Sequence, residues 1–509
     1  MGLGRTTAVS LLGLSGHMIE VEAHLAASVP GFTLVGLPDA SLAEARDRVR
    51  AAMTSSGLSW PQRRITVNLS PASLPKAGSS FDLAIAVATL VGAGVCDADA
   101  AAQVVHLGEL GLDGRLRPVR GVLPAVVAAV AAGRPRVVVP YANADEARLV
   151  PGAEVRAAAH LAEVAGWYGA DVQVPDLDPV RTESVAPPVT GVADMADVVG
   201  QRAARWALEV AAAGGHHVLM VGPPGAGKTM LAARLPGLLP DLDERAAVEV
   251  TAVHSVAGTF RASDGLLRRP PFEDPHHTAT PAAVIGGGSG LPRPGAASRA
   301  HRGVLFMDEA PEFSPQVLQT LRQPLESGEL VIHRAGGTAR YPARFQLVLA
   351  ANPCPCGRSV GKGLDCTCTP MARRRYFSRL SGPLLDRVDL QLEVLPVTRA
   401  DRTAAAAPEP TQAVAARVAA ARRVARRRLT GTPWTTNAEV PGPWLRAHTS
   451  AARDPHLEAA LDSGVLSLRG VDRVLRVAWT LADLAGRSEP GPTEVGQALL
   501  LRTRVRVGR

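Results

Sequence analysis

The stretch that most constrains this chain is a glycine-rich segment, Gly222-Pro-Pro-Gly-Ala-Gly-Lys228-Thr229. Its pattern, G-x-x-x-x-G-K-[ST], lets the backbone curl so that successive N–H groups point at phosphate oxygens. An apolar run of strand character, 218–221, leads into the segment, and a helix-forming stretch begins at Met230. The positive N-terminal end of that helix faces the same anion. Because strand, loop and helix follow in this order, we interpret the segment as a phosphate-binding loop and not as a chance glycine-rich turn.

The residues of this loop have expected roles toward ATP and Mg²⁺. Lys228 should reach the terminal phosphates, and the hydroxyl of Thr229 should be a ligand of Mg²⁺. The remaining residues of the predicted cradle are Gly222, Pro223, Pro224, Gly225, Ala226 and Gly227. The sequence therefore predicts ATP and Mg²⁺ as the cofactors.

Two further apolar runs end in polar residues suited to phosphoryl chemistry. The run 304–307 is followed by Asp308 and Glu309, and the run 345–350 ends close to Asn352. Parallel strands deliver such residues to one edge of a sheet, beside the phosphate loop. We expect Asp308 in the Mg²⁺ shell and Glu309 to orient and polarise the attacking water. Asn352 is expected to position that water or to sense the γ-phosphate.

Two arginines are candidates for contacts to the γ-phosphate. Arg387 is predicted just outside the sheet, from where it would reach a nucleotide on a neighbouring subunit. Such an arginine finger contributes about 10³–10⁵ in rate. The alternative for Arg387 is a surface salt bridge with Asp386 or Asp389. Arg469, which starts a C-terminal helix, is expected to sense the γ-phosphate of its own chain, with Arg473 as the next candidate.

Four cysteines form two C-x-C pairs that lie close together in the sequence. These candidate metal ligands are Cys354, Cys356, Cys366 and Cys368. Four thiolates bind Zn²⁺ tetrahedrally, although C-x-C is tighter than the usual C-x₂₋₄-C spacing. Two interpretations of these cysteines therefore remain: ligands of a structural Zn²⁺, or free thiols in a reduced cytosol. The adjacent His276 and His277 make a poor metal site alone and favour a polar loop or a partner contact.

The net charge of +8 favours a polyanionic partner. Basic residues gather in a predicted β-hairpin over 329–344 with its turn at 335–338, in the run 373–375 with Arg379, and in the helical stretch 412–429. The basic flanks of the hairpin are His333, Arg334 and Arg340. The hairpin is interpreted either as solvated or as a loop that enters a central pore and touches nucleic-acid phosphates. Arginines on the C-terminal helix are usually a solvated face, although they also suit DNA.

The N-terminal third has the pattern of a mixed α/β domain. Strands are predicted over 65–69 and 136–140, and an amphipathic helix over 40–55. The polar side of that helix is expected to include Arg46, Arg48 and Arg50.

A loop in this third, Pro75-Lys-Ala-Gly-Ser-Ser80, resembles the nucleophile loop of the Lon-type protease domain, with Ser80 as the nucleophile. That chemistry is a Ser–Lys dyad, in which an amine takes the serine proton. Leu123 occupies the position of the base, and a leucine cannot accept a proton. Lys76 lies in the loop itself. We therefore expect a Lon-like fold without peptidase activity.

Motifs along almost the whole chain resemble the YifB/ComM family of magnesium-chelatase-like AAA+ ATPases. The motifs are VGLPD at 35–39, RRITVN at 63–68, the phosphate loop at 222–229, PHHT at 275–278, LRQPLE at 321–326, NPCPCG at 352–357 and SGPLLDR at 381–387. Two departures from the family are Arg299, in a segment where the family has an acid and no arginine, and His217, where the family tends to have Asn.

The resemblance implies an α/β fold with three domains. An AAA+ P-loop core with a helix-2 insert is expected at 192–395, preceded by a Lon-protease-like (S5-type) α+β domain at 1–172. A helical lid domain is expected at 412–509, with linkers at 173–191 and 396–411.

The same resemblance implies ring hexamers and, for ComM, a helicase that drives branch migration when natural transformation integrates incoming DNA. We therefore expect an ATP-hydrolysing homo-hexameric motor that acts on single-stranded or branched DNA, with recombination proteins as further partners. A chelatase-like or chaperone-like protein-remodelling ATPase is the alternative, and an ATP-dependent protease is disfavoured by Leu123.

The sequence also bears on the compartment. Five cysteines in a chain of this length favour a reducing, cytoplasmic location. The longest weakly polar runs, near 83–96 and 121–133, fall short of the roughly 18 residues needed to span a bilayer, so no membrane is expected.

Overall fold

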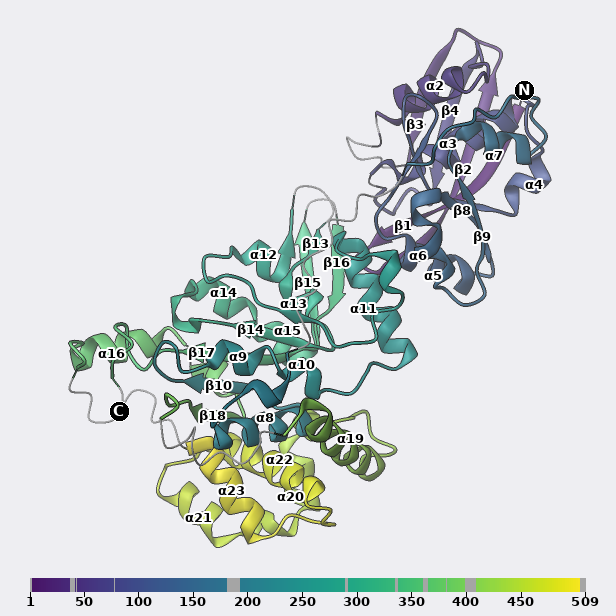
Figure 1. The fold of residues 1–509 in the computed structure, drawn as a ribbon. Coiled ribbons are helices and arrows are strands. Elements are labelled where there is room, and N and C mark those ends of the chain that lie inside the picture. Colours follow the sequence, from purple (N-terminus) through teal and green to yellow (C-terminus); the bar gives the residue numbers. More distant parts are fainter. Residues whose placement is uncertain are drawn as a thin grey trace.

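The computed structural model describes residues 2–36, 42, 44–76, 78–180, 193–288, 292–334, 337–359, 365–380, 382–398 and 409–503. Figure 1 shows an N-terminal α/β part, a central part built on a parallel sheet and a C-terminal helical part. The mixed α/β class predicted from the sequence is therefore confirmed. None of the described helices is both long enough and apolar enough to cross a membrane.

The N-terminal part contains a seven-stranded sheet in the order β3-β4-β2-β1-β5-β8-β9. Its strands are β1 (Gly2–Leu12), β2 (Ser15–Ala26), β3 (Gly31–Val35), β4 (Arg64–Ser70), β5 (Val105–His106), β8 (Arg136–Pro140) and β9 (Glu154–Ala158). A separate two-stranded ribbon pairs β6 (Glu109–Leu110) with β7 (Leu116–Arg117). The helices are α2 (Ala45–Ser55), α3 (Asp82–Gly92), α4 (Ala98–Ala102), α5 (Val122–Ala131), α6 (Ala144–Arg148) and α7 (Leu161–Trp167). The predicted strands over 65–69 and 136–140 are β4 and β8, so both are confirmed.

The predicted helix over 40–55 is confirmed from Ala45, and residues 40, 41 and 43 lie outside the described residues. Arg46 and Arg50 are exposed as expected, but Arg48 is not a solvated residue. Its Nε donates to Oδ2 of the fully buried Asp82 at 2.7 Å. Burial raises the pKa of Asp82 to about 6 against the lowering effect of Arg48. The prediction for Arg48 is therefore wrong, because a buried carboxylate distant in sequence needs a partner.

The central part is a five-stranded sheet in the order β11-β14-β17-β10-β18 in which every neighbouring pair is parallel. Its strands are β10 (Val218–Val221), β11 (Phe272–Glu273), β14 (Val304–Met307), β17 (Gln346–Ala351) and β18 (Leu390–Glu393). Its helices are α8 (Arg202–Gly214), α9 (Lys228–Ala232), α10 (Leu235–Leu238), α11 (Glu244–Ala257), α14 (Pro315–Thr320), α15 (Arg322–Ser327), α16 (Pro370–Ser378) and α17 (Gly382–Leu385). Every residue of β10, β14 and β17 is buried, as expected for a parallel sheet covered on both faces. Their carboxyl ends meet at one edge, as the sequence predicts.

Short elements between α11 and β17 form an insert beside this sheet. They are α12 (Pro281–Ile285), β12 (Gly286–Gly287), β13 (Arg293–Pro294), α13 (Ala296–Arg299), β15 (Glu329–Arg334) and β16 (Gly337–Pro342). β15 and β16 pair antiparallel from Glu329 opposite Pro342 to Arg334 opposite Gly337, which confirms the predicted hairpin. Residues 335 and 336 of its predicted turn lie outside the described residues.

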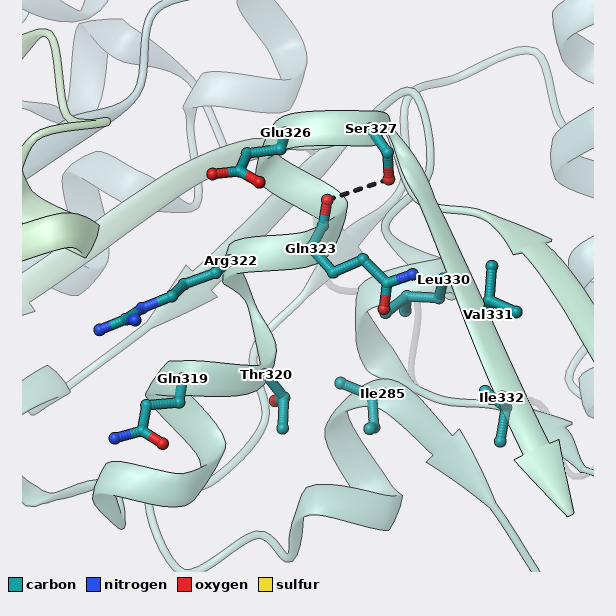
Figure 2. Close-up of a pocket in the computed structure, with 10 residues that line it drawn as sticks. All are labelled: Ile285, Gln319, Thr320, Arg322, Gln323, Glu326, Ser327, Leu330, Val331 and Ile332. Atoms are coloured by element: carbon teal, nitrogen blue, oxygen red, sulfur yellow. Dashed lines mark hydrogen bonds between the residues drawn. The ribbon is translucent and has the colours of Figure 1, made fainter.

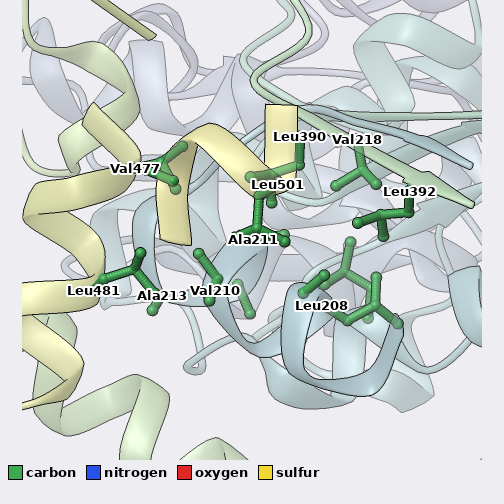
Figure 3. Close-up of a cluster of buried hydrophobic side chains, with 14 of the residues drawn as sticks. Leu208, Val210, Ala211, Ala213, Val218, Leu390, Leu392, Val477, Leu481 and Leu501 are labelled. Atoms are coloured by element: carbon green, nitrogen blue, oxygen red, sulfur yellow. The ribbon is translucent and has the colours of Figure 1, made fainter. Parts of the chain in front are cut away.

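The C-terminal part consists of α19 (Thr411–Arg428), α20 (Gly442–His448), α21 (Pro455–Asp462), α22 (Leu468–Leu484) and α23 (Pro492–Thr503), besides short 3₁₀ turns. Figure 3 shows how side chains of α22 and α23 pack with those of α8, β10 and β18 in one apolar cluster. Five members of this cluster are Leu208, Val218, Leu390, Val477 and Leu501. The helical part is thus fixed against the side of the sheet that ends in β18.

The helical stretch predicted over 412–429 is confirmed as α19. Val414, Val418 and Ala421 are buried, but Val424 is 38% exposed and Ala425 is buried in its place. The predicted linkers contain no helix or strand over 173–180, 396–398 and 409–410, and α19 begins at Thr411, the last residue of the second linker. Their parts at 181–191 and 399–408 lie outside the described residues.

Candidate nucleotide site

The predicted phosphate loop follows β10 directly and ends where α9 begins at Lys228. Gly225 and Gly227 adopt left-handed φ values of 75° and 90°, which glycine tolerates without strain. Gly222 passes so close to β18 that a Cβ there would lie 2.1 Å from the carbonyl oxygen of Val394. The glycines are therefore required for the curl of the backbone and for its close approach to the neighbouring strand.

Lys228 is buried at the base of this loop, with 8% of its surface exposed. Its Nζ donates to the carbonyl oxygens of Gly222 at 2.6 Å and Pro223 at 3.0 Å, and to Asn352 Oδ1 at 3.1 Å. Burial lowers the pKa of Lys228, and Asp308 raises it in opposition. The structure thus brings together Lys228, at the start of α9, and Asn352, just after β17. Phosphate oxygens of a bound nucleotide would replace the carbonyl acceptors of Lys228.

Thr229 and Asp308 converge as expected for a Mg²⁺ site. Thr229 Oγ1 donates to Asp308 Oδ2 at 2.7 Å, and the backbone N–H of Glu309 donates to Asp308 Oδ1 at 2.9 Å. A hydroxyl and a carboxylate oxygen at this separation are the donor set that Mg²⁺ takes beside a bound nucleotide. The residues present therefore fit the metal that the loop implies.

Glu309 has an unusual backbone and an unexpected partner. Its φ of 50° lies in the left-handed region, which a residue with a Cβ seldom adopts. Its Oε2 lies 3.1 Å from Nδ1 of His277. In the sequence, His277 stands out only as one of two adjacent histidines. No local sequence pattern shows that the chain after β11 returns to the end of β14.

Gln201 is a second residue near the loop that the sequence did not single out. Its Nε2 donates to the carbonyl oxygens of Ala226 at 3.1 Å and Leu395 at 2.5 Å, and its φ is 48°. It thus ties the phosphate loop to the end of β18. The available signal was the Val199-Gly200-Gln201 turn before α8, whose polar residue has no other obvious role.

The four clustered cysteines lie beside the same loop. Their sulfur atoms all lie within 4.8 Å of one another, and Cys354 Sγ is 3.3 Å from Cys356 Sγ and 3.7 Å from Cys366 Sγ. Cys354, Cys356, Cys366 and Cys368 are, in the part of the chain that the structure describes, the only group of three or more side chains placed to hold a metal ion. A Cβ on Gly357 would lie 2.7 Å from Pro224, so the cysteine loop packs against the phosphate loop.

The chemistry of the thiols suits a tetrathiolate metal site. The backbone N–H of Arg358 lowers the pKa of Cys356 to about 6, whereas burial raises the pKa of Cys354 to about 12. Converging soft sulfur ligands in a tetrahedral-sized cluster fit Zn²⁺.

Arg387 and Arg469 lie together, at the edge of the sheet opposite to the phosphate loop. β18 runs parallel to β10 with Leu390 opposite Val218, so residues before Leu390 lie at the amino edge. Four-residue strands with a rise of about 3.3 Å per residue separate the two edges by roughly 10 Å. Arg387 forms an ion pair with Glu326 of α15, and Arg469 Nη1 lies 3.9 Å from Asp386 Oδ2. The expectation that Arg469 senses the nucleotide of its own chain does not fit this placement.

A polar cleft of about 890 Å³ opens at this edge, between the central and C-terminal parts, and both arginines line it. Arg473, the next sensor candidate, also lines it, but its guanidinium is committed to a buried ion pair. Its Nη1 donates to Asp389 Oδ1 at 2.8 Å, and its side chain is 18% exposed. The partner of Arg387 is Glu326, not the predicted Asp386 or Asp389.

The basic regions differ in whether their arginines have partners within the same chain. On α19, Arg422 is partly buried and its Nε donates to the carbonyl oxygen of Ala212, and Arg428 pairs with Asp483. On α16, Arg374 and Arg375 are exposed and have no ion-pair partner among the described residues. On the hairpin, the side chain of Arg340 is 70% exposed, and its Nη1 lies 3.9 Å from Glu329 Oε2.

In the loop that contains Ser80, the hydroxyl of the neighbouring Ser79 donates to a carboxylate oxygen of Glu109. Leu123 is completely buried in α5, and its N–H donates to Glu146 Oε1 at 2.9 Å. The Lys76 amine is buried too, and it donates to the carbonyl oxygen of Pro71. The expectation that Ser80 is inactive stays a prediction.

Comparison with known proteins places the chain among magnesium-chelatase-like proteins. Three family descriptions match: "Subunit ChlI of Mg-chelatase" over residues 21–143, "Magnesium chelatase, subunit ChlI" over 194–402 and "Magnesium chelatase, subunit ChlI C-terminal" over 408–502. The chain is 53% identical over 505 residues to an uncharacterized protein of Mycobacterium tuberculosis, with 99% of each chain covered. It is 40% identical over 499 residues to the competence protein ComM of Haemophilus influenzae, covering 97% of this chain and 96% of that one. It is also 40% identical over 476 residues to the uncharacterized protein YifB of Escherichia coli, covering 93% and 92%.

Proposed function

The chain belongs to the YifB/ComM family of magnesium-chelatase-like proteins, and from this premise we propose that it is an ATP-hydrolysing ring motor that acts on DNA. The observation that supports hydrolysis most directly is the meeting of three strand ends at one edge of the sheet. Lys228, Thr229, Asp308 and Asn352 are joined there by hydrogen bonds, with Glu309 next to them.

Each of these residues has a defined task in hydrolysis. The oxygen of a water molecule bonds to the γ-phosphorus, the bond from that phosphorus to the bridging oxygen breaks, and ADP leaves with the bridging oxygen. Glu309 orients this water and accepts its proton, and Lys228 holds the phosphates on which negative charge accumulates. Thr229 and Asp308 would hold Mg²⁺, which supplies a positive charge to the phosphate oxygens. Asn352 fixes the ammonium group of Lys228 from the adjacent strand.

The arginines at the opposite edge support assembly into a ring. Arg387 and Arg469 cannot reach the phosphate loop of their own chain across the sheet, yet both line a wide, polar cleft. We assign both to the nucleotide of a neighbouring subunit, so that one chain supplies the cradle and the next supplies the arginines. A closed homo-hexamer, as the family resemblance implies, would repeat this arrangement at every interface.

Exposed arginines support DNA as the polymer on which the ring acts. Arg340 on the hairpin and Arg374 and Arg375 on α16 are exposed and suited to phosphate contacts. The Haemophilus influenzae relative is named a competence protein, which supports a role with incoming DNA. We therefore favour a helicase or branch-migration activity during natural transformation or recombination, in the cytoplasm.

Protein remodelling is the second candidate function. The family descriptions that match all three parts of the chain are those of a magnesium chelatase subunit, and they favour a chelatase-like or chaperone-like ATPase equally. A protein cofactor that stimulates ATP hydrolysis in the absence of DNA would support this candidate.

The structural metal in this proposal is Zn²⁺, bound by Cys354, Cys356, Cys366 and Cys368. The metal would fix the segment after β17, where Asn352 contacts Lys228, and the Gly357 contact to Pro224 would brace the phosphate loop. The N-terminal part is proposed to be Lon-like and inactive as a peptidase, because Leu123 stands in place of the base.

The test is the ATPase rate of the purified protein with single-stranded, forked and three-stranded DNA. We expect DNA to stimulate hydrolysis, with binding that weakens steeply as salt rises. Lys228→Ala should lower turnover about 10²–10³-fold, because it removes a charge that stabilises the transferring phosphoryl group. Substantial hydrolysis by this variant would contradict the assignment of the site, and indifference to every DNA would contradict the DNA motor.

A further inference from the structure

We propose that Arg502, near the end of α23, is a positioning residue: it fixes the backbone from which Arg387 reaches the nucleotide of a neighbouring subunit. This inference rests on the proposed function, because it concerns an arginine that completes a neighbour's site. It makes the last described helix of the chain part of the structure that presents Arg387.

Arg387 lies in a short connection that is neither helix nor strand. α17 ends at Leu385 and β18 begins at Leu390, so residues 386–389 belong to neither element. Helices and strands pair most of their own backbone groups, whereas a connection of this kind needs other partners for its N–H and C=O groups. The source of these partners determines how firmly the backbone of Arg387 is held.

Two N–H groups of the connection are paired within the central part. The N–H of Arg387 donates to the carbonyl oxygen of Leu384 at 3.0 Å. The N–H of Val388 donates to the carbonyl oxygen of Leu385, also at 3.0 Å. The donor side of this backbone is therefore anchored to the last turn of α17.

Two carbonyl groups of the connection are paired with the C-terminal part. Arg502 Nη1 donates to the carbonyl oxygen of Val388 at 2.8 Å. Arg473 Nη1, on α22, donates to the carbonyl oxygen of Arg387 at 3.4 Å, besides its shorter bond to Asp389. Two helices of the C-terminal part thus hold two consecutive carbonyl groups, and one of these belongs to Arg387 itself.

The packing of α23 explains why Arg502 reaches this connection. α23 contacts β18, and Leu501 is buried in one apolar cluster with Leu390, the first residue of that strand. Figure 3 shows the side chains of Leu501 and Leu390 near each other. Because Arg502 directly follows Leu501, the same packing brings its guanidinium to Val388, two residues before β18.

The bond from Arg502 is suited to hold a backbone in place. Its side chain is partly buried, and a charged donor makes a shorter and stronger hydrogen bond to a carbonyl oxygen than a neutral donor does. Without this donor, the carbonyl group of Val388 loses its partner, and the connection is held by α17 and Arg473 alone. A displacement of about 1 Å near a reacting group lowers a rate about 10²-fold, so a small shift of the backbone at Arg387 is enough to slow hydrolysis.

The experiment compares Arg502→Ala with Arg487→Ala, a matched control in the same helical part. Arg487 pairs with Glu494 at 3.2 Å, near the opposite end of α23. We expect Arg502→Ala to lower kcat about 10- to 100-fold with an unchanged KM for ATP, because Arg387 is displaced while the chain's own phosphate loop stays intact. Arg487→Ala should hydrolyse ATP like the wild type. Arg502→Lys, which can donate to the same carbonyl oxygen, should retain most of the wild-type kcat.

A double variant distinguishes positioning of Arg387 from a general structural role. If Arg502 acts through Arg387, adding Arg502→Ala to Arg387→Ala should change the residual rate less than about twofold. The thermal midpoint and the ring assembly of Arg502→Ala should match those of Arg487→Ala. A wild-type kcat in Arg502→Ala would overturn the inference, and so would additive effects in the double variant.

Failure of this inference differs from failure of the proposed function. If Arg387→Ala slows hydrolysis about 10³-fold and Arg502→Ala leaves it unchanged, the role of Arg502 is refuted and that of Arg387 stands. If Arg387→Ala hydrolyses ATP at the wild-type rate, the assignment of Arg387 to a neighbour's nucleotide fails, and the inference fails with it.

Discussion

The buried carboxylate of Asp389 should be one of the most sensitive positions of the chain. It is fully buried at the start of β18, with Oδ2 3.0 Å from His216 Nδ1 and Oδ1 2.8 Å from Arg473 Nη1. In Asp389→Ala, the guanidinium of Arg473 stays largely buried and loses its carboxylate. Removing one partner of a buried ion pair costs about 3–5 kcal/mol, so we expect a loss of stability of that size.

The sign of the pH dependence follows from the same contacts. Burial raises the pKa of Asp389, but Arg473 and His216 outweigh it, so the pKa in the folded protein is lowered. The unfolded value is about 3.9. The stabilisation by Asp389 is therefore complete above that value and is lost as the pH falls toward the folded pKa. Asp389→Asn, which does not ionise, should lose less stability than the wild type as the pH falls below about 4.

Urea unfolding followed by tryptophan fluorescence, at fixed protein concentration, measures these changes. Trp479 lies on α22, the helix that bears Arg473, and reports on the relevant junction. A cost below about 1 kcal/mol for Asp389→Ala would refute the reasoning. So would an Arg473→Ala variant of normal stability but with greatly reduced ATP hydrolysis, because Arg473 would then act on nucleotide and not as the partner of Asp389.

Two further predictions concern the subunit interface and the metal. Arg387→Ala should lower ATP hydrolysis about 10³-fold or more. Mixing this variant with Lys228→Ala should restore part of the activity. In the mixed ring, some interfaces join an intact phosphate loop from one subunit to an intact Arg387 from its neighbour. Mixtures that stay inactive while forming rings would contradict sharing of sites. We expect roughly one equivalent of Zn²⁺ per chain in the wild type, measured by metal analysis. Cys366→Ser should abolish this binding and lower the thermal midpoint of unfolding, measured by calorimetry. Wild-type protein purified without metal, yet equally stable, would favour free thiols.

The sequence was most informative where the determinants of structure are local. The phosphate loop needs only glycines, Lys228 and Thr229 in a fixed order, and its strand and helix lie on either side. Asp308 follows a strand that is recognisable by its apolar run, so its arrival beside Thr229 was also predictable. Parallel strands then impose a common edge without further information.

The positions that could not be predicted depend on contacts between distant segments. Arg469 begins a recognisable helix, but its location relative to the sheet depends on how that helix packs on β18. Arg48 looks like part of a solvated helix face until α3 places Asp82 beneath it. The local patterns around Gln201 and His277 do not reveal their partners, because these depend on which strand ends are neighbours. In each case the local pattern was recognised correctly and the partner was not.

The N-terminal part packs against one side of the insert. In Figure 1 it adjoins the central part near α11 and β16. Ser255 of α11 donates to Glu146 of α6 at 2.5 Å, and a Cβ on Gly13 would lie 2.3 Å from the carbonyl oxygen of Arg340. α11 and one strand of the hairpin are therefore held by a second packed domain.

On the opposite side of the insert, Ile285 at the end of α12 lines a cavity (Figure 2), although Val284 of the same helix is buried in the core of the central part. A load on the hairpin would therefore meet packed contacts with the N-terminal part on one side and this cavity on the other. The N-terminal part, even without peptidase chemistry, would thus limit the directions in which the hairpin moves.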